Sequence, residues 1–291
     1  MLTLVIPKGS LEPMTLSLLS EADLPLRRGS ERDYHGTIDD PRIDRVSILR
    51  PQEIPTYVAE GRFDIGITGL DWVHETGADV EIVSGLSLSG RAGGRARIVF
   101  AVPNELDIDG AKDTPDGFRI STKYPNLTRK AFEALGIDVK VFLSYGATEA
   151  KVPDIVDGVV EVTESGSTLK RAGLKIVETF LESETVIIAN KASFADPAKR
   201  AALTDIEMLL KGVIEARGRV LMKLNVSAAD LERVLEVVPS MKAPTISKLA
   251  HDEAYAIETV VEKRRINVLI PQLKERGATD IVELPISKIV P

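Results

Sequence analysis

The sequence predicts an α/β protein whose first part forms two lobes and whose last part forms a smaller domain. Short apolar segments typical of buried strands alternate with segments of helical periodicity over residues 1–211. A stretch rich in glycine, serine and arginine interrupts this alternation at Ser87 to Arg95, as expected where a chain crosses between lobes. Residues 212–291 follow the order strand, helix, strand, strand, helix, strand. At 291 residues, the chain is long enough for two or three domains.

Composition and charge exclude several classes of protein. The net charge of −7 gives no general attraction to nucleic acid or anionic lipid, so neither is expected as a partner. Without cysteine, and with three histidines far apart, the sequence offers no disulfide, thiolate site or zinc-like spacing. Leu2 to Ile6 is expected to be a strand rather than a signal peptide, and no apolar run approaches the ~20 residues of a membrane span. We therefore expect a cytoplasmic protein with no membrane partner.

The first lobe is expected to contain a parallel sheet with helices between its strands. Strands are predicted at residues 2–6, 45–49 and 63–67. Helices are predicted from residue 10 to about 21, around 54–58 and from residue 68, with a hairpin or loop at 22–43. Ligands of such sheets bind outside the carboxyl ends of the strands. The polar or glycine residues at these ends are Lys8, Gly9, Arg50, Thr68, Gly69 and Asp71. Each of them alone also fits a turn, a helix cap or a surface ion pair.

The second lobe is expected to be a similar α/β layer. Strands are predicted at residues 97–102, 118–122, 139–143 and 159–162, and further strands at 174–180 and 186–190 return the chain to the first lobe. Asn126 is expected to cap a helix that ends at Gly136, and another helix is expected to begin at residues 146–149. A long helix is predicted at 197–216.

The stretch Gly158 to Leu169 is the most informative part of the second lobe. A valine strand carries Glu161 and Glu164 and then breaks into a loop of small hydroxyl residues around Gly166. Glycine allows close backbone approach, and hydroxyl and N–H groups can donate to one anion, so this layout suits a sugar phosphate. The hydroxyl residues are Thr163, Ser165, Ser167 and Thr168. The same residues also fit an ordinary strand followed by an N-capped helix.

The last domain is predicted to be ferredoxin-like from its element order. The expected strands lie at residues 219–226, 243–249, 255–263 and 281–284, with helices at 228–237 and 270–276. Gly277 is expected to end the second helix. This small fold is common and implies no activity by itself.

Five phrases spread along the chain resemble, in order, the long form of ATP phosphoribosyltransferase. They are Lys8-Gly9, the 22 positions from Arg50 to Asp71, Lys123 to Arg129, Gly146 to Glu149, and Gly158 to Leu169. The chain departs from the family at Ser10 and Leu70, where arginine is usual or frequent, at Glu161, where aspartate is usual, and at Asn225, which has an acid nearby in the family. The segment Ser87 to Arg95 also differs, because the family has a shorter and more aromatic one.

The resemblance implies a transfer of 5-phosphoribosyl from phosphoribosyl pyrophosphate to N1 of ATP, the first step of histidine biosynthesis, with Mg²⁺ carried by substrate phosphates. It implies phosphoribosyl pyrophosphate-binding residues Glu161, Thr163, Glu164, Ser165, Gly166, Ser167 and Thr168. It implies ATP-binding residues Lys8, Gly9, Arg50, Gly69, Asp71, Trp72, Tyr124 and Glu149. No general base is implied, because N1 of adenine is already a nucleophile.

The resemblance also implies a periplasmic-binding-protein-like catalytic part with lobe I at residues 1–93 and 182–211 and lobe II at 94–181, followed by a regulatory domain at 212–291. Histidine would act there as an inhibitor, near Asn225, Thr245, Val260 and Asp280. A homo-oligomer, either a dimer or a hexamer, is expected. The alternative hypothesis is a non-catalytic, two-lobed small-molecule binding protein with a sensing domain.

Overall fold

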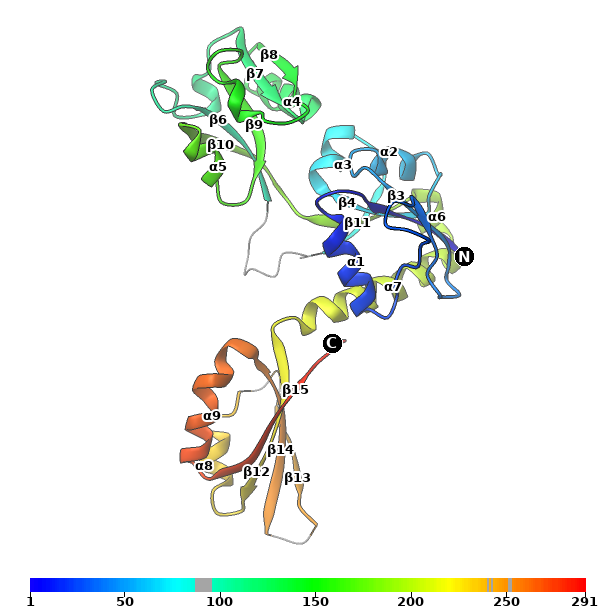
Figure 1. Ribbon diagram of the computed structural model, residues 1–291, viewed down its shortest axis with the longest axis vertical. Helices are drawn as coiled ribbons and strands as arrows, with labels where there is room; N and C mark the ends of the chain where they lie inside the picture. The colour runs from blue at the N-terminus through cyan, green and yellow to red at the C-terminus, as the bar shows by residue number, and fades with distance from the viewer. Residues whose placement is uncertain (87–95, 240, 242, 251–252) are drawn as a thin grey trace. The chain divides into compact units, whose positions relative to one another are not determined.

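The computed structural model describes residues 1–86, 96–239, 241, 243–250 and 253–291. The expected crossing segment Ser87 to Arg95 lies outside the described residues. The described chain divides into two compact units, which are residues 1–20 with 24–207 and residues 21–23 with 208–291 (Figure 1). Each unit is built on its own sheets, so each is described separately.

The first sheet of the first unit is mostly parallel around its centre. In spatial order its strands are β2 (His35–Gly36), β3 (Ile43–Leu49), β1 (Leu2–Pro7), β4 (Ile65–Gly69), β11 (Thr185–Ala189) and β5 (Glu81–Leu86). Strand β1 pairs in parallel with β3 and β4, whereas β11 is antiparallel to β4 and β5. The helices of this part are α1 (Glu12–Glu21), α2 (Ile54–Ala59), α3 (Leu70–Thr76) and α6 (Lys191–Ala195). Buried side chains of β1, α2 and β11 form one apolar cluster. This burial explains why the two strands, β1 and β11, are continuous apolar runs.

The second sheet of the first unit places three parallel strands side by side. In spatial order its strands are β10 (Leu174–Ser183), β6 (Ala96–Pro103), β9 (Gly158–Thr163), β7 (Phe118–Thr122) and β8 (Val139–Leu143). Strand β7 is parallel to β8 and β9, so the carboxyl ends of all three meet at one edge. The helical segments are η1 (Ala111–Asp113), α4 (Pro125–Leu135), η2 (Glu149–Lys151) and α5 (Ser167–Arg171). Its core includes edge-to-face packing of Phe100 on Phe132, with ring centroids 5.2 Å apart.

Two local predictions in this sheet's connections were wrong. The helix expected from residues 146–149 is only the 3₁₀ turn Glu149–Lys151, because Gly146 and Ala147 both have positive φ and so cannot begin a helix. Asn126 does not cap α4 but lies within its first turn. The helix begins two residues earlier than predicted, at Pro125 with Tyr124 as its N-cap, because proline suits the first helical position, where its missing N–H is not needed.

The second unit contains an antiparallel sheet with the predicted order of elements. The last helix before it is α7 (Pro197–Ala216), and its elements are β12 (Arg219–Ser227), α8 (Leu231–Leu235), β13 (Thr245–Lys248), β14 (Ala254–Glu262), η3 (Lys263–Arg265), α9 (Ile266–Glu275) and β15 (Ala278–Pro285). The strands lie in the order β13-β14-β12-β15, which is the ferredoxin-like arrangement. Residues Met222, Leu224 and Ile257 pack against Leu269 and Leu273 of α9.

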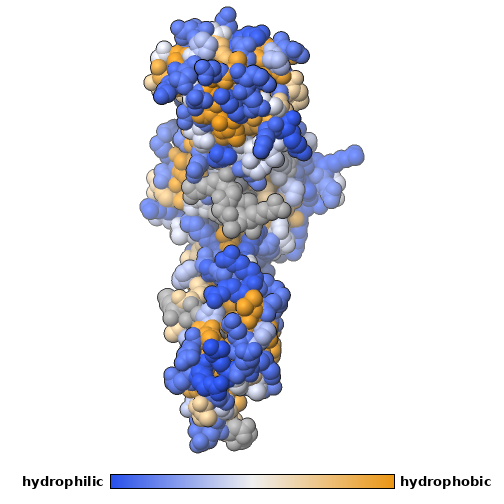
Figure 2. All heavy atoms as spheres, turned by 90° about the vertical axis from the view of Figure 1, so that its left-hand side faces the viewer, coloured by the Kyte–Doolittle hydropathy of each residue, from blue (hydrophilic) through white to orange (hydrophobic). Residues whose placement is uncertain are grey.

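The structure confirms the predicted fold class, an α/β part with two sheets followed by a ferredoxin-like domain. Helix α8 is shorter than predicted, and α9 begins at Ile266 rather than at residue 270. Figure 2 shows hydrophilic side chains over most of the described surface facing the viewer, with hydrophobic ones between them. Within the described ranges, no helix has the combination of length and apolar character needed to cross a bilayer.

Candidate functional site

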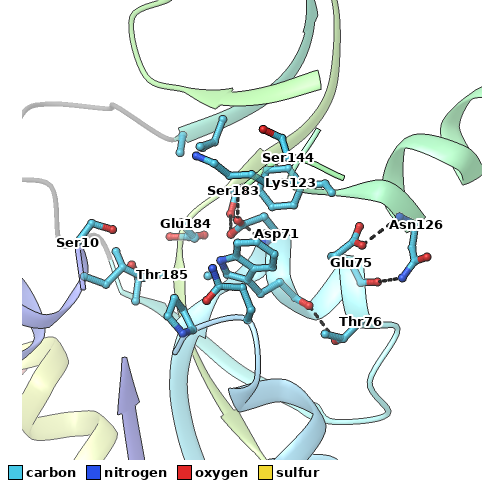
Figure 3. A pocket seen from close by; sticks show the side chains of 18 of the residues that line it. Ser10, Asp71, Glu75, Thr76, Lys123, Asn126, Ser144, Ser183, Glu184 and Thr185 are labelled. Atoms are coloured by element: carbon cyan, nitrogen blue, oxygen red, sulfur yellow. Dashed lines mark hydrogen bonds between the residues drawn. The ribbon is translucent and has the colours of Figure 1, made fainter. Parts of the chain in front are cut away.

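A pocket of about 920 Å³ lies in the first unit and is lined from both of its sheets. Its walls include residues that follow β1, β3 and β4 on one side and residues that follow β7 and β8 on the other. Figure 3 shows Lys123 and Ser144 on one side of it, apart from Ser10 and Thr185. Ligands of parallel sheets bind at such carboxyl edges, so this pocket is the candidate site. The predicted site residues that line it are Gly69, Asp71, Trp72, Tyr124 and Glu164.

A buried hydrogen-bond network centres on Asp71, at the start of α3. The Asp71 N–H donates to Ser183 Oγ over 3.0 Å, and the Ser183 hydroxyl donates back to Asp71 Oδ1 over 2.8 Å. The Tyr124 hydroxyl donates to the other carboxylate oxygen, Oδ2, over 2.7 Å. The Asp71 side chain also folds back over Gly69, so that a Cβ atom at residue 69 would overlap the carboxylate. Both oxygens of a buried carboxylate are thus satisfied, one by Ser183 at the end of β10 and the other by Tyr124, which precedes α4.

Tyr124 is the aromatic member of this network and is only 2% exposed. Burial raises the pKa of its phenol far above the usual range, and the adjacent Asp71 carboxylate raises it further. The phenol therefore stays protonated and acts as a donor. Its ring lies against Trp72, with centroids 4.7 Å apart and planes tilted by 35°. These two aromatic side chains form an apolar part of the pocket wall.

Glu75 joins α3 to the start of α4. Its carboxylate accepts hydrogen bonds from the backbone N–H groups of Asn126 (3.0 Å) and Leu127 (2.8 Å), and the Asn126 amide donates to the Glu75 carbonyl oxygen (3.1 Å). Figure 3 shows Glu75 and Asn126 facing each other at one end of the pocket. A carboxylate at a helix N-terminus satisfies N–H groups that have no partner within the helix. Glu75 thereby fixes the position of the segment that carries Lys123 and Tyr124.

The carboxyl edge of the first sheet carries two predicted cations. The Lys8 ammonium donates to Glu12 Oε1 over 3.1 Å, and Arg28 donates to the same oxygen over 2.9 Å. Burial raises the pKa of Glu12, but the hydrogen bonds from Lys8 and Arg28 outweigh it and leave the pKa below its usual value. Arg50 is exposed and lies beside Gly9. A Cβ atom added to Gly9 would be 3.9 Å from Nη1 of Arg50. Lys8 and Arg50 thus bring positive charge to this edge.

The loop after β9 is closed by its own hydroxyl groups. The Gly166 N–H donates to Thr163 Oγ1 over 2.8 Å, and the Ser165 hydroxyl donates to Ser167 Oγ over 3.1 Å. Gly166 has φ = +74°, which favours glycine, and a Cβ atom there would meet Ile176 Cδ1 at 2.9 Å. Ser165, Ser167 and Thr168 are exposed, so their hydroxyl groups are accessible to a ligand.

Glu161 lies beside this loop but is buried. Its carboxylate accepts a hydrogen bond from the Val162 N–H over 3.0 Å and lies 3.4 Å from the Lys123 ammonium. Lys123 lines the pocket, so the pair links the end of β7 with the end of β9. Several predicted site residues do not themselves line the pocket in this structure. They are Lys8, Gly9, Arg50, Glu149, Glu161, Thr163, Ser165, Gly166, Ser167 and Thr168.

Three residues of the site were missed from the sequence. Ser183 bonds Asp71, Glu75 binds α4, and Ser144 lines the pocket after β8. Ser183 gave no signal, because it lies on a returning strand far from Asp71 in sequence. Glu75 could have been noticed as an acid in a short helix close to the 22-residue phrase, and Ser144 as a hydroxyl residue at a strand end.

The predicted effector residues belong to the second unit. The Asn225 amide donates to Asp280 Oδ2 over 3.0 Å, so these two predicted residues are in contact. Asn225 lies opposite Ala256 and Thr245 lies opposite Glu258, two positions further along β14, so both side chains are on the same face of the sheet. Val260 lies on that face as well, whereas the face with Met222 and Leu224 packs against α8 and α9.

The fold and the pocket define a class of protein that binds small ligands between two α/β sheets and carries an additional ferredoxin-like domain. Residues 50–212 match the family model for ATP phosphoribosyltransferase, and residues 216–288 match the model for its C-terminal domain. The chain belongs to the ATP phosphoribosyltransferase family. This result favours the catalytic hypothesis over a non-catalytic binding protein.

Named relatives cover the whole chain. ATP phosphoribosyltransferase of Desulforudis audaxviator is 42% identical over 290 residues, which are 100% of this chain and 99% of the relative. That of Chlorobium phaeovibrioides is 43% identical over 99% of this chain and 97% of the relative. Among solved structures, a chain of the ATP phosphoribosyl transferase (HisG:HisZ) complex from Thermotoga maritima is similar, with a TM-score of 0.63 and 28% identity. The similarity covers 74% of this chain and 99% of that one.

Proposed function

We propose that this protein transfers the 5-phosphoribosyl group from phosphoribosyl pyrophosphate to N1 of ATP, giving phosphoribosyl-ATP and pyrophosphate. This would be the first step of histidine biosynthesis. The observation that carries the proposal is a pocket that reaches the carboxyl edges of both sheets, with Asp71 and Trp72 on one side and Lys123 and Glu164 on the other. Two substrates that react with each other need such a shared space.

The β9 loop would bind the ribose phosphate. The exposed hydroxyl groups of Ser165, Ser167 and Thr168 can donate to phosphate oxygens, and Gly166 permits close backbone approach. Glu161 and Glu164 are the carboxylates nearest in sequence and can accept from ribose hydroxyls. Thr163 would act indirectly, because its hydroxyl already accepts the Gly166 N–H and so shapes the loop.

ATP would lie toward α3 and the end of β7. Trp72 offers an exposed part of an aromatic ring to a base, and Gly69, Asp71 and Tyr124 form the wall behind it. Lys8 and Arg50 bring positive charge to the neighbouring strand ends, where phosphates can be bound, and Gly9 lies between them. Glu149, in the turn after β8, would approach the nucleotide from the second sheet.

The reaction requires the leaving pyrophosphate to be stabilised while an oxocarbenium-like ribose forms. Positioning two bound substrates and neutralising the leaving group with cations such as Lys8 would lower the barrier, and no general base is assigned. Within the described residues, no group of three or more histidine, aspartate and glutamate side chains could hold a metal ion. We propose that Mg²⁺ enters the site with the substrate phosphates.

The transferase is tested by pyrophosphate release with ATP, phosphoribosyl pyrophosphate and Mg²⁺, and by calorimetry with each substrate. We expect turnover and binding of both substrates. Thr168→Ala should weaken the binding of phosphoribosyl pyrophosphate more than that of ATP, because we propose that the Thr168 hydroxyl contacts the sugar phosphate. A folded, correctly assembled protein that binds one small molecule in the pocket but never releases pyrophosphate would instead be the non-catalytic binding protein.

We further propose that the second unit binds histidine as an inhibitor, through Asn225, Thr245, Val260 and Asp280. The shared sheet face of the first three and the contact between Asn225 and Asp280 support this assignment. The expected homo-oligomer, a dimer or a hexamer, and the cytoplasmic location stay predictions. The lobe limits also stay a proposal, with lobe I at 1–93 and 182–211, lobe II at 94–181 and the regulatory domain at 212–291. Strand β10 of the second sheet runs to Ser183, two residues beyond the proposed end of lobe II at residue 181.

A further inference from the structure

Lys151 is a half-buried lysine whose ammonium has only neutral partners among the residues that the structure describes. It ends the turn η2, and its Nζ donates to Ser144 Oγ over 2.7 Å and approaches Ser121 Oγ at 3.4 Å. In the described part of the chain, no carboxylate forms a salt bridge with it. Partial burial of a charged group is unfavourable unless an opposite charge compensates it.

Its place in the fold points to a ligand. Ser121 is in β7 and Ser144 directly follows β8, so the ammonium lies at the carboxyl edge of this parallel pair. Ser144 lines the pocket and is seen near Lys123 in Figure 3. Lys123, by contrast, already has an acidic partner, because Glu161 lies 3.4 Å from it. Lys151 therefore brings an uncompensated positive charge beside the pocket.

A purely structural role explains this arrangement less well. The loop between β8 and η2 is held without Lys151, since the Ser144 hydroxyl lies 3.0 Å from Thr148 Oγ1 and 3.2 Å from the Gly146 carbonyl oxygen. Thr148 is fully buried and immediately precedes η2, so its contact with Ser144 connects the two ends of the loop. The ammonium is thus an additional group on a loop that is already closed.

We propose that Lys151 is a substrate-binding residue that contacts a phosphate group of a substrate at the β7–β8 edge of the pocket. The proposal rests on the proposed function for the identity of the substrates. The triphosphate of ATP and the pyrophosphate of phosphoribosyl pyrophosphate share this chemistry, and either would provide the missing negative charge. A phosphate oxygen would replace or join the two serine hydroxyls as an acceptor of the ammonium hydrogen bonds.

The test compares the full-length protein with Lys151→Met, Lys151→Arg and Lys140→Met. Lys140 is an exposed lysine of β8 in the same sheet, so its replacement controls for the loss of one positive charge. Calorimetry measures the affinity of each protein for ATP, phosphoribosyl pyrophosphate and inorganic pyrophosphate at two salt concentrations. Thermal unfolding of each variant checks that it is folded.

Lys151→Met should lower the affinity for inorganic pyrophosphate and for at least one substrate by about 10- to 100-fold, as expected for the loss of one hydrogen bond to a charged group. The substrate whose affinity falls identifies the source of the phosphate. Lys151→Arg should keep most of the affinity, the salt dependence should be smaller in Lys151→Met, and Lys140→Met should behave as the original protein.

The proposal would be overturned if Lys151→Met and Lys140→Met bound all three ligands with equal affinity. It would also be overturned if the original protein bound none of the three ligands. Absence of turnover by the original protein would reject the transferase, but the affinity for inorganic pyrophosphate would still report on Lys151. Should Lys151→Met prove unfolded, Lys151→Gln provides the same comparison with a polar side chain that can keep the serine contacts.

Discussion

The Tyr124 hydroxyl donates a hydrogen bond to a buried carboxylate oxygen of Asp71. Tyr124→Phe keeps the ring beside Trp72 but leaves this oxygen without that donor. An unsatisfied buried acceptor costs about 1–3 kcal/mol, so we expect the free energy of unfolding of the first unit to fall by that amount. Urea unfolding followed by tryptophan fluorescence measures it, since Trp72 is the sole tryptophan of the chain.

Tyr145→Phe is the matched control for Tyr124→Phe. Tyr145 also lines the pocket but is 93% exposed, so water surrounds its hydroxyl group. Removing that hydroxyl group should therefore leave no buried protein group without a partner. We expect its urea midpoint to equal that of the original protein. Equal midpoints for all three proteins would show that the Tyr124–Asp71 hydrogen bond contributes nothing to stability.

Asp64, just before β4, should make stability depend on pH in acid. Burial raises the pKa of its carboxyl group, but hydrogen bonds from Lys199, Ser193 and Thr3 outweigh burial and hold the pKa at about 2, below the ordinary 3.8. Because the folded pKa is lowered, the stabilisation is present above pH ~4 and is lost as the pH falls toward about 2. Its size is on the order of 2 kcal/mol, since one pKa unit corresponds to ~1.4 kcal/mol.

Comparison with Asp64→Asn tests this pH dependence. The variant should be less stable than the original protein at pH 7, and the difference between them should shrink steadily between pH ~4 and pH ~2. Thermal unfolding at a series of pH values provides the measurement. A difference that stays constant down to pH 2 would mean that Asp64 acts through its shape and not through its charge.

The sequence was sufficient to nominate Asp71 and Tyr124 individually, but not their contact. Both were predicted through phrases that resemble a family, and each lies at a strand end, where ligands of parallel sheets bind. The hydrogen bond between them joins residues 53 positions apart. Periodicity and turn signals report on local structure only, so they contain no information about which strand ends face one another. Ser183 and Lys151 were not nominated for the same reason.

Strands were predicted more accurately than short helices. Continuous apolar runs marked β6 and β11 to within a few residues, because central strands that are buried on both faces need such runs. Strands β7 and β8 were also located from their apolar residues, although polar residues interrupt them. The segment after β8 was misjudged because glycine and alanine with positive φ at 146 and 147 leave room for only one 3₁₀ turn. An alanine in that conformation is imposed by the surrounding contacts, which a single sequence does not reveal.

The β9 loop depends on the positive φ of Gly166. Gly166→Ala would force an L-residue into this conformation, at about 1 kcal/mol, and would place its Cβ atom 2.9 Å from Ile176 Cδ1. The loop should therefore shift, and the affinity for phosphoribosyl pyrophosphate should fall about tenfold or more, with a smaller effect on ATP. Calorimetry with each substrate separates the two effects.

Gly117→Ala provides the control for the Gly166 substitution. Gly117 has nearly the same φ, +78°, but an added Cβ atom would meet nothing within 4 Å, and the residue is outside the pocket. It should lose a similar amount of stability from backbone strain while keeping both affinities. If Gly117→Ala and Gly166→Ala weakened phosphoribosyl pyrophosphate equally, general destabilisation rather than loop geometry would be the cause.

Helix α7 belongs to both units of the molecule. Its periodicity predicted the bounds Pro197–Ala216, which the structure has, but the division between the units falls inside the helix, between Glu207 and Met208. Helical periodicity continues across such a point, because each half of the helix still presents an apolar face to a core. The position of a unit boundary within a continuous helix is therefore not encoded in the periodic pattern.

Separation of catalysis from regulation is the prediction that involves the whole chain. A chain shortened to residues 1–211 keeps both sheets and the pocket of the first unit, and it lacks the ferredoxin-like sheet and every proposed effector residue. Among the ion pairs it loses are those of Glu21 with Arg217 and of Asp23 with Lys288, which are surface pairs of low energetic value. We expect circular dichroism to show a folded protein, and pyrophosphate release that histidine no longer inhibits.

Full-length Asp280→Asn is the companion variant, because it removes one carboxylate and keeps the second unit. Asparagine tolerates the positive φ of this position, +48°, and can still accept from Asn225, so the sheet should stay intact. If Asp280 binds the ammonium group of histidine, as we propose, the concentration for half-inhibition should rise about tenfold, the effect expected of one charge-assisted hydrogen bond. Histidine inhibition that survives in the shortened chain would move the effector site out of the second unit, whereas loss in the shortened chain with unchanged inhibition in Asp280→Asn would keep the site in that unit and exclude Asp280 from it.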